Sequence, residues 1–148
     1  YKGVFTLGEN SQWNCDRYEG EFISGQKHGF GTYTSGMFEE WRKQGITYKP
    51  EAFKYPTDFD SWEGYRYEGE WKDNKFNGQG TLILTDGTKY KGGFVNGLEE
   101  GSGVQEDKNG NRYEGFFKQG KKDGPFVETD KNGKLVRKGT YKMGRLSN

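Results

Sequence analysis

Residues 67–89 read YEGEWKDNKFNGQGTLILTDGTK, and the same pattern starts again at residue 90 and at residue 113. Each of the three copies is 23 residues long and begins with a tyrosine, followed by a glycine two residues later and a second aromatic residue four residues later. A further glycine stands at the twelfth position, and Asp-Gly or Asn-Gly comes close to the end. Self-similarity at a fixed period indicates a repeat architecture.

Further copies flank these three. One begins at Tyr18, and truncated copies begin near residues 1 and 137. The last copy has Arg137 in place of the leading tyrosine, and the third full copy has Phe126 where its predecessors have Gly80 and Gly103. We therefore interpret the chain as a single array whose units start near residues 1, 18, 67, 90, 113 and 137.

The first residues of each unit have the period of a β-strand. Tyr67, Gly69 and Trp71 are two residues apart, so they point to one face of a sheet, and the two glutamates between them point to the other. The polar segment KDNKFN, residues 72–77, suits a hairpin loop. The closing Asp-Gly is the strongest short turn signal. Each unit is therefore predicted to be one β-hairpin, turned tightly into the next.

The glycine inside the strand needs a physical reason, because glycine normally weakens a strand. Here it leaves a gap in the sheet surface, across which a neighbouring aromatic ring can lie. Leu, Ile, Val and Phe make up only about 17% of the chain, and Phe, Trp and Tyr also make up 17%, so the buried surface must be largely aromatic. The predicted fold class is all-β: an elongated, single-layer antiparallel sheet of consecutive hairpins.

The segments YEGEW, NGQGTL and DGTKYKGGF closely resemble the MORN (membrane occupation and recognition nexus) repeat. The resemblance covers residues 18–36 and 67–133 well, and residues 1–8 and 137–148 weakly. It implies a twisted sheet of hairpins that has no catalytic activity of its own and serves as a scaffold or binding module. MORN arrays also accompany lipid kinases and SET-domain methyltransferases, so the regulatory region of a larger enzyme is an alternative.

Residues 37–66 interrupt the repeat. The leading tyrosines on its two sides are 49 residues apart, three more than two periods. The stretch includes the aromatic residues Tyr55, Phe59 and Trp62 and two of the three prolines, which favour extended or turn conformations. Two interpretations stay open: the insertion packs over one sheet face as a structural lid, or its aromatic rings frame a partner site.

The leading functional hypothesis is a non-enzymatic scaffold that holds a protein partner on the aromatic face of its sheet, within a larger assembly. Aromatic anchors on a rigid surface are typical binding hot spots. The candidate partner-binding residues are Tyr55, Phe59, Trp62, Tyr67, Trp71, Tyr90, Phe94, Tyr113 and Phe117. A homodimer through a sheet edge or face is a further prediction, because an open sheet has two edges that can pair with another copy.

A second hypothesis is binding to anionic phospholipid. Residues 118–148 carry a net charge of +6, whereas residues 1–117 carry −5, and a basic end on an acidic body indicates an acidic partner or membrane surface. The candidate lipid-binding residues are Lys121, Lys122, Lys134, Arg137, Lys138, Lys142 and Arg145. The overall charge of only +1 argues against nucleic acid.

The sequence offers little for catalysis. His28 is the single histidine and Cys15 the single cysteine, too few ligands for a typical zinc site. We interpret His28, which precedes Gly29 in the stretch HGFG, as a turn residue and not as the base of a catalytic triad. No phosphate-binding glycine motif is present. We therefore expect no enzyme activity, no cofactor and no metal. One cysteine fits a reducing compartment, so the expected location is cytoplasmic, with cytoskeletal or membrane association.

Overall fold

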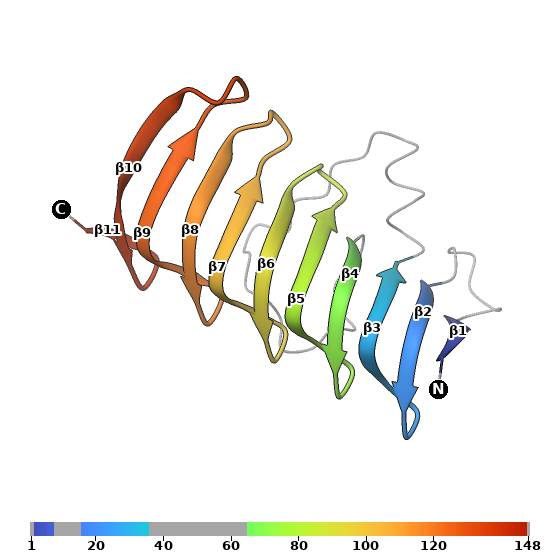
Figure 1. Ribbon diagram of the computed structural model, residues 1–148. Helices are drawn as coiled ribbons and strands as arrows, with labels where there is room; N and C mark the ends of the chain where they lie inside the picture. The colour runs from blue at the N-terminus through green and yellow to red at the C-terminus, as the bar shows by residue number, and fades with distance from the viewer. Residues whose placement is uncertain (1, 8–15, 36–64, 148) are drawn as a thin grey trace.

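The computed structural model describes residues 2–7, 16–35 and 65–147. These residues form one sheet of eleven strands whose spatial order follows the chain, and each strand is antiparallel to its neighbours (Figure 1). The predicted all-β, single-layer fold is confirmed. The strands are β1 (Lys2–Leu7), β2 (Asp16–Ile23), β3 (Gln26–Thr34), β4 (Tyr65–Lys72), β5 (Lys75–Leu84), β6 (Lys89–Val95), β7 (Leu98–Glu106), β8 (Arg112–Lys118), β9 (Lys121–Thr129), β10 (Leu135–Lys142) and β11 (Arg145–Ser147).

The hairpin inside each unit closes in a turn of two residues that both have positive φ. In the unit that starts at Tyr67 these are Asp73 and Asn74, with φ of 50° and 66°, the geometry of a type I′ turn. The predicted loop over residues 72–77 is therefore too long. Strand β5 begins at Lys75, and Phe76 is fully buried, because a type I′ turn needs only two residues that tolerate the left-handed region.

The turn between units is the one that the closing Asp-Gly predicts. The Gly87 N–H donates to the Leu84 carbonyl oxygen (3.0 Å), and the Leu84 N–H donates to the Thr88 carbonyl oxygen (2.9 Å). Gly87 has a φ of 89°, which glycine adopts without strain. The next two units repeat these bonds around Gly110 and Gly133.

The two glycines in the second half of a unit have different structural roles. The first, Gly78, has a φ of 88° and lies in a bulge, where one residue of β4 faces three residues of β5 between the pairs Gly69–Gly80 and Trp71–Phe76. The second, Gly80, is directly opposite Gly69. A bulge bends the strand and increases its twist, so every hairpin curves at the same height.

A continuous line of glycines crosses the sheet at that height, and we call it the glycine row. Each member pairs with the next on the neighbouring strand, and only Phe126 on β9 interrupts the row. The members are Gly3, Gly20, Gly31, Gly69, Gly80, Gly92, Gly103, Gly115 and Gly139.

Tyr18, Tyr67 and Tyr90 each lie across a pair of these glycines, and Tyr113 lies across Gly115, which confirms that rings cover the gaps. A Cβ atom on Gly80 would be 2.3 Å from the Tyr67 hydroxyl oxygen and 2.5 Å from two ring carbons. The Tyr67 hydroxyl donates to the Glu70 carbonyl oxygen at 2.8 Å. The tyrosines of the other three units make the same bond three residues ahead, from Tyr18, Tyr90 and Tyr113.

The sheet face that carries these rings, the aromatic face, is held by edge-to-face contacts that continue from unit to unit. The Tyr67 ring lies 5.0 Å from Trp71 of its own unit and 5.4 Å from Phe94 of the next, both nearly perpendicular. The Tyr90 ring repeats this with Phe94 and Phe117, at 5.0 and 5.1 Å. This is the geometry that aromatic quadrupoles favour, so ring pairs join neighbouring hairpins in place of a second layer.

The predicted insertion does not separate the strands on its two sides. Strand β3 pairs directly with β4, and the Tyr18 ring contacts Trp71 at 5.4 Å. Strand β4 begins at Tyr65, so the last two residues of the predicted insertion belong to the sheet. The remainder of the insertion lies outside the described residues.

A matched pair of alanine variants tests the packing of rings on glycines. A Cβ atom on Gly69 would be 2.4 Å from the Gly80 Cα atom, and overpacking of this kind typically costs about 1–3 kcal/mol. We therefore expect Gly69→Ala to lower the free energy of unfolding by about that amount. Glu68→Ala, on the opposite face, should change it by about 0.5 kcal/mol or less. Urea denaturation measures both, and equal losses would contradict the face assignment.

Candidate functional site

The predicted partner-binding rings within the described residues form the core. Each of them is at most 5% exposed; they are Tyr67, Trp71, Tyr90, Phe94, Tyr113 and Phe117. In this conformation they offer almost no surface to a partner, so their contact with one stays a prediction. Tyr55, Phe59 and Trp62, the other three candidates, lie outside the described residues.

The predicted basic surface loses two of its members to internal contacts. The Lys122 ammonium lies 4.1 Å from the Tyr113 ring centroid and 5.4 Å from the Tyr141 centroid, and burial lowers the pKa of this lysine. Arg137 donates from Nε and Nη2 to the two carboxylate oxygens of Glu128, both at 3.0 Å. Arg137 stays exposed despite this pair. The other candidates are exposed as well: Lys121, Lys134, Lys138, Lys142 and Arg145.

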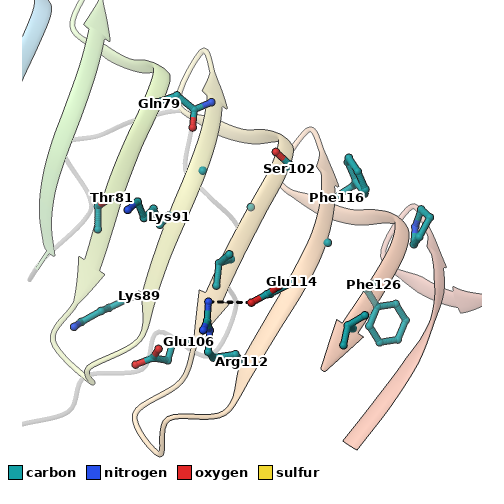
Figure 2. A pocket seen from close by; sticks show the side chains of 16 residues that line it. Gln79, Thr81, Lys89, Lys91, Ser102, Glu106, Arg112, Glu114, Phe116 and Phe126 are labelled. Carbon is teal, nitrogen blue, oxygen red and sulfur yellow. Dashed lines mark ion pairs between the residues drawn. The ribbon is translucent and has the colours of Figure 1, made fainter. Parts of the chain in front are cut away.

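The face opposite the rings, the open face, is hollowed over strands β5 to β9. This trough has a volume of about 850 Å³, toward the upper end of the roughly 300–1,000 Å³ of ligand pockets. Its floor includes the backbone of Gly92, Gly103 and Gly115 of the glycine row. Figure 2 shows the side chains around it, among them those of Thr81, Lys91, Glu114 and Phe116. Val104 and Val127 also line it.

The trough lies where the repeat departs from its own pattern. The second and fourth residues of the unit that starts at Tyr67 are Glu68 and Glu70, but in the next unit Lys91 and Gly93 stand there. In the third unit the fourth residue is Phe116. These departures point to the open face, whereas the repeated tyrosine, glycine and second aromatic residue build the sheet.

The exchange of glutamate for Phe116 has a local cause. The Glu70 carboxylate accepts a hydrogen bond from the backbone N–H of Gln79, directly after the bulge glycine. The equivalent residue in the third unit is Pro125, which has no N–H to donate. A carboxylate at position 116 would therefore lack the hydrogen bond that Glu70 accepts. The Phe116 side chain packs against Gly124 instead: the Phe116 Cβ atom would be 3.2 Å from a Cβ atom placed on that glycine. Phe116 remains 46% exposed and Val127 41% exposed.

Sequence reasoning missed this site because it placed the partner on the aromatic face and did not compare the units on the opposite face. The available signal was the contrast between units. A residue that every unit repeats is needed to build the sheet. A residue that a single unit changes on the polar face is not needed for the sheet, so it can contribute to binding. That comparison identifies Lys91, Gly93 and Phe116 without coordinates.

Two kinds of feature are absent from the described part of the chain. Within it there is no cluster of three or more His, Cys, Asp or Glu side chains that could hold a metal ion. The same ranges contain no helix that is long and apolar enough to cross a membrane.

The comparisons agree with the architecture. The family model described as the MORN repeat matches residues 18–37, 67–89, 90–112 and 113–125. A search of curated proteins found no match.

The buried tyrosines predict a loss of stability at alkaline pH. Burial raises the pKa of Tyr18 and Tyr113 to about 12 and that of Tyr67 and Tyr90 further, against about 10 in an unfolded chain. Above about pH 10 the unfolded chain therefore loses protons that the folded chain keeps, and the free energy of unfolding falls as pH rises.

Denaturation by urea at several pH values between about 8 and 12, with tyrosinate absorbance recorded in parallel, measures this effect. We expect the absorbance of these four rings to appear together with unfolding. Their ionisation near pH 10 in a chain that is still folded would contradict the burial argument.

Proposed function

The chain belongs to the MORN repeat family, and from this we propose that it is a non-enzymatic scaffold that holds a protein partner on its sheet, with the trough on the open face as the contact surface. MORN repeats are generally binding modules, typically without catalytic activity. The observation that carries the proposal is the pair Phe116 and Val127, which lie on the adjacent strands β8 and β9 and are both more than two-fifths exposed beside a recess.

Exposed apolar side chains beside a concavity are the usual mark of an interaction site. The aromatic face supports this site without touching the partner, because its interlocked rings hold the strands beneath the trough in one arrangement. A surface that is already rigid loses little entropy on binding. A partner seated on the aromatic face itself would have to use what little surface the rings leave exposed.

The same site fits the alternative that this array is the regulatory repeat region of a larger enzyme of the lipid kinase or SET methyltransferase type. In either case the sheet supplies binding and not catalysis. The partner remains a protein segment, and a second copy of the chain joined at a sheet edge would leave the trough accessible.

Two phenylalanines on the same face test the proposal. Peptides selected from a random phage-displayed library on the immobilised chain should bind Phe116→Ala at least ten-fold more weakly, a loss of about 1.4 kcal/mol that is typical of interface residues that matter. Phe30→Ala is the control, because Phe30 is 53% exposed and lies outside the trough. Both variants should keep the melting temperature of the parent chain. Equal binding by the parent chain and Phe116→Ala would contradict the trough as the contact surface.

A second candidate function is attachment to anionic lipid through the basic end. The specific observation in its favour is that Lys138 pairs with Val127 across the sheet and Lys142 lies four residues further along β10, so both side chains are on the open face. Each exposed cation near an anionic leaflet contributes about 1 kcal/mol.

Vesicle flotation tests this second candidate. Replacing Lys138 and Lys142 with glutamine should weaken binding to phosphatidylserine vesicles about thirty-fold, the equivalent of about 2 kcal/mol. The matched control replaces Lys72 and Lys75, an exposed pair at another turn, with glutamine. If both double variants float like the parent chain, the basic end is not a membrane contact.

A further inference from the structure

Among the four units whose leading tyrosines are Tyr18, Tyr67, Tyr90 and Tyr113, one reverses the charge that the other three place on the open face. Directly after the leading tyrosine, three units have glutamate, and each glutamate forms an ion pair with the arginine two residues before it: Arg17–Glu19 at 2.9 Å, Arg66–Glu68 at 3.9 Å and Arg112–Glu114 at 2.9 Å. The unit that starts at Tyr90 has lysine at both positions, Lys89 and Lys91. Among the described residues neither lysine forms an ion pair within 4 Å.

The neighbours of Lys91 leave its charge without an acidic side chain beside it. Across the sheet it lies between Thr81 on β5 and Val104 on β7, both uncharged. Glu114, one strand further, is held by Arg112, as the dashed line in Figure 2 shows. Lys91 is exposed and lines the trough, so an incoming anion meets a cation whose surroundings are partly apolar.

The opposite side of the trough contributes its apolar side chains. Val104, Phe116, Pro125 and Val127 line it from strands β7 to β9, beside the polar side chains of Ser102, Glu106, Arg112 and Glu114. Lys91 on β6 and Phe116 on β8 are two strand spacings apart and two residues out of register, because the pairing runs from Lys91 through Val104 to Glu114. At about 4.8 Å per spacing and about 3.4 Å per residue, this separation is about 12 Å. An extended chain advances about 3.3 Å per residue, so a segment that crosses the strands obliquely would span it with about three to four residues.

From this arrangement we infer that the trough selects an acidic protein segment, in which an aspartate or glutamate pairs with Lys91 and an apolar side chain about three to four residues away covers Phe116 and Val127. The inference rests on the proposed function, because it names the chemistry of the partner that the trough holds. Charge complementarity sets the selection, because the trough is lined by three cations, Lys89, Lys91 and Arg112, and by two acids, Glu106 and Glu114. Glu114 is paired with Arg112, and Glu106 lies opposite Lys89 across the sheet. Lys91 is therefore the cation that remains for an incoming anion, and it would repel a basic segment.

The repeat itself supplies the variant that tests this inference. Lys91→Glu restores the residue that three other units carry at the same position, so the sheet accommodates it. Glu68→Lys is the matched control, since it makes the opposite exchange at the same position of the neighbouring unit, outside the trough. The probes are peptides selected from the random phage-displayed library on the parent chain.

We expect the selected peptides to combine Asp or Glu with apolar residues. Lys91→Glu should weaken their binding at least ten-fold, and Glu68→Lys should leave it within about two-fold. The same peptides with their acids replaced by lysine should bind Lys91→Glu more tightly than they bind the parent chain. Circular dichroism and melting temperature confirm that both variants are folded.

Three outcomes would overturn the inference. In the first outcome, peptide binding depends on Phe116, but the peptides carry no acidic residues or bind Lys91→Glu as tightly as the parent chain. The trough then holds a protein segment of other chemistry, and the proposed function stands. If no peptide depends on Phe116, both fail. If acidic peptides do not bind but phosphatidylserine vesicles do so in a Lys91-dependent manner, the trough belongs to a lipid contact.

Discussion

The packing of one tyrosine ring on one pair of glycines is the constraint on which the rest of this structure depends. A single-layer sheet has no second layer to bury its side chains against, so each ring must lie flat on the backbone. Tyr67 can do so only because Gly69 and Gly80 carry no side chain, and its hydroxyl is satisfied by the Glu70 carbonyl oxygen. The glycine row, the bulges and the ring contacts between units all follow from repeating this arrangement at a fixed height.

Because the rings must pack on one face of the sheet, the two faces differ in the substitutions that they tolerate. On the aromatic face a change must keep the packing. Phe126, in the unit that starts at Tyr113, replaces a glycine of the row, and its ring lies 3.2 Å from where a Cβ atom on Gly139 would be. Gly139 belongs to the next unit, in which Arg137 takes the place of the leading tyrosine. On the open face a change costs little, because its side chains contact water. Lys91 and Phe116 could therefore change without loss of the sheet, and it is there that we place the partner.

Only part of the candidate site was within reach of sequence reasoning. The alternation of residues predicts correctly which side chains share a face, and the repeat predicts that unit follows unit. Phe76 was assigned to a loop because its neighbours are polar, although a two-residue turn at Asp73 and Asn74 returns it to the core. Lys122 was counted as a surface cation, although cation–π contact turns it onto the Tyr113 ring. Both errors concern side chains whose position depends on a neighbouring strand.

The amino-acid sequence by itself determines the hairpin array. The repeat length, the alternation of side chains along each strand and the glycine turns are local properties, and they recur from unit to unit. The sequence also determines that rings and glycines must meet, since no other residues are available to form a core. Only the tertiary structure decides that β3 pairs directly with β4 across the insertion. It also decides that the aromatic rings bury one another, and that the open face forms a trough between Lys91 and Phe116. These features arise from contacts between different units, which no single repeat can specify.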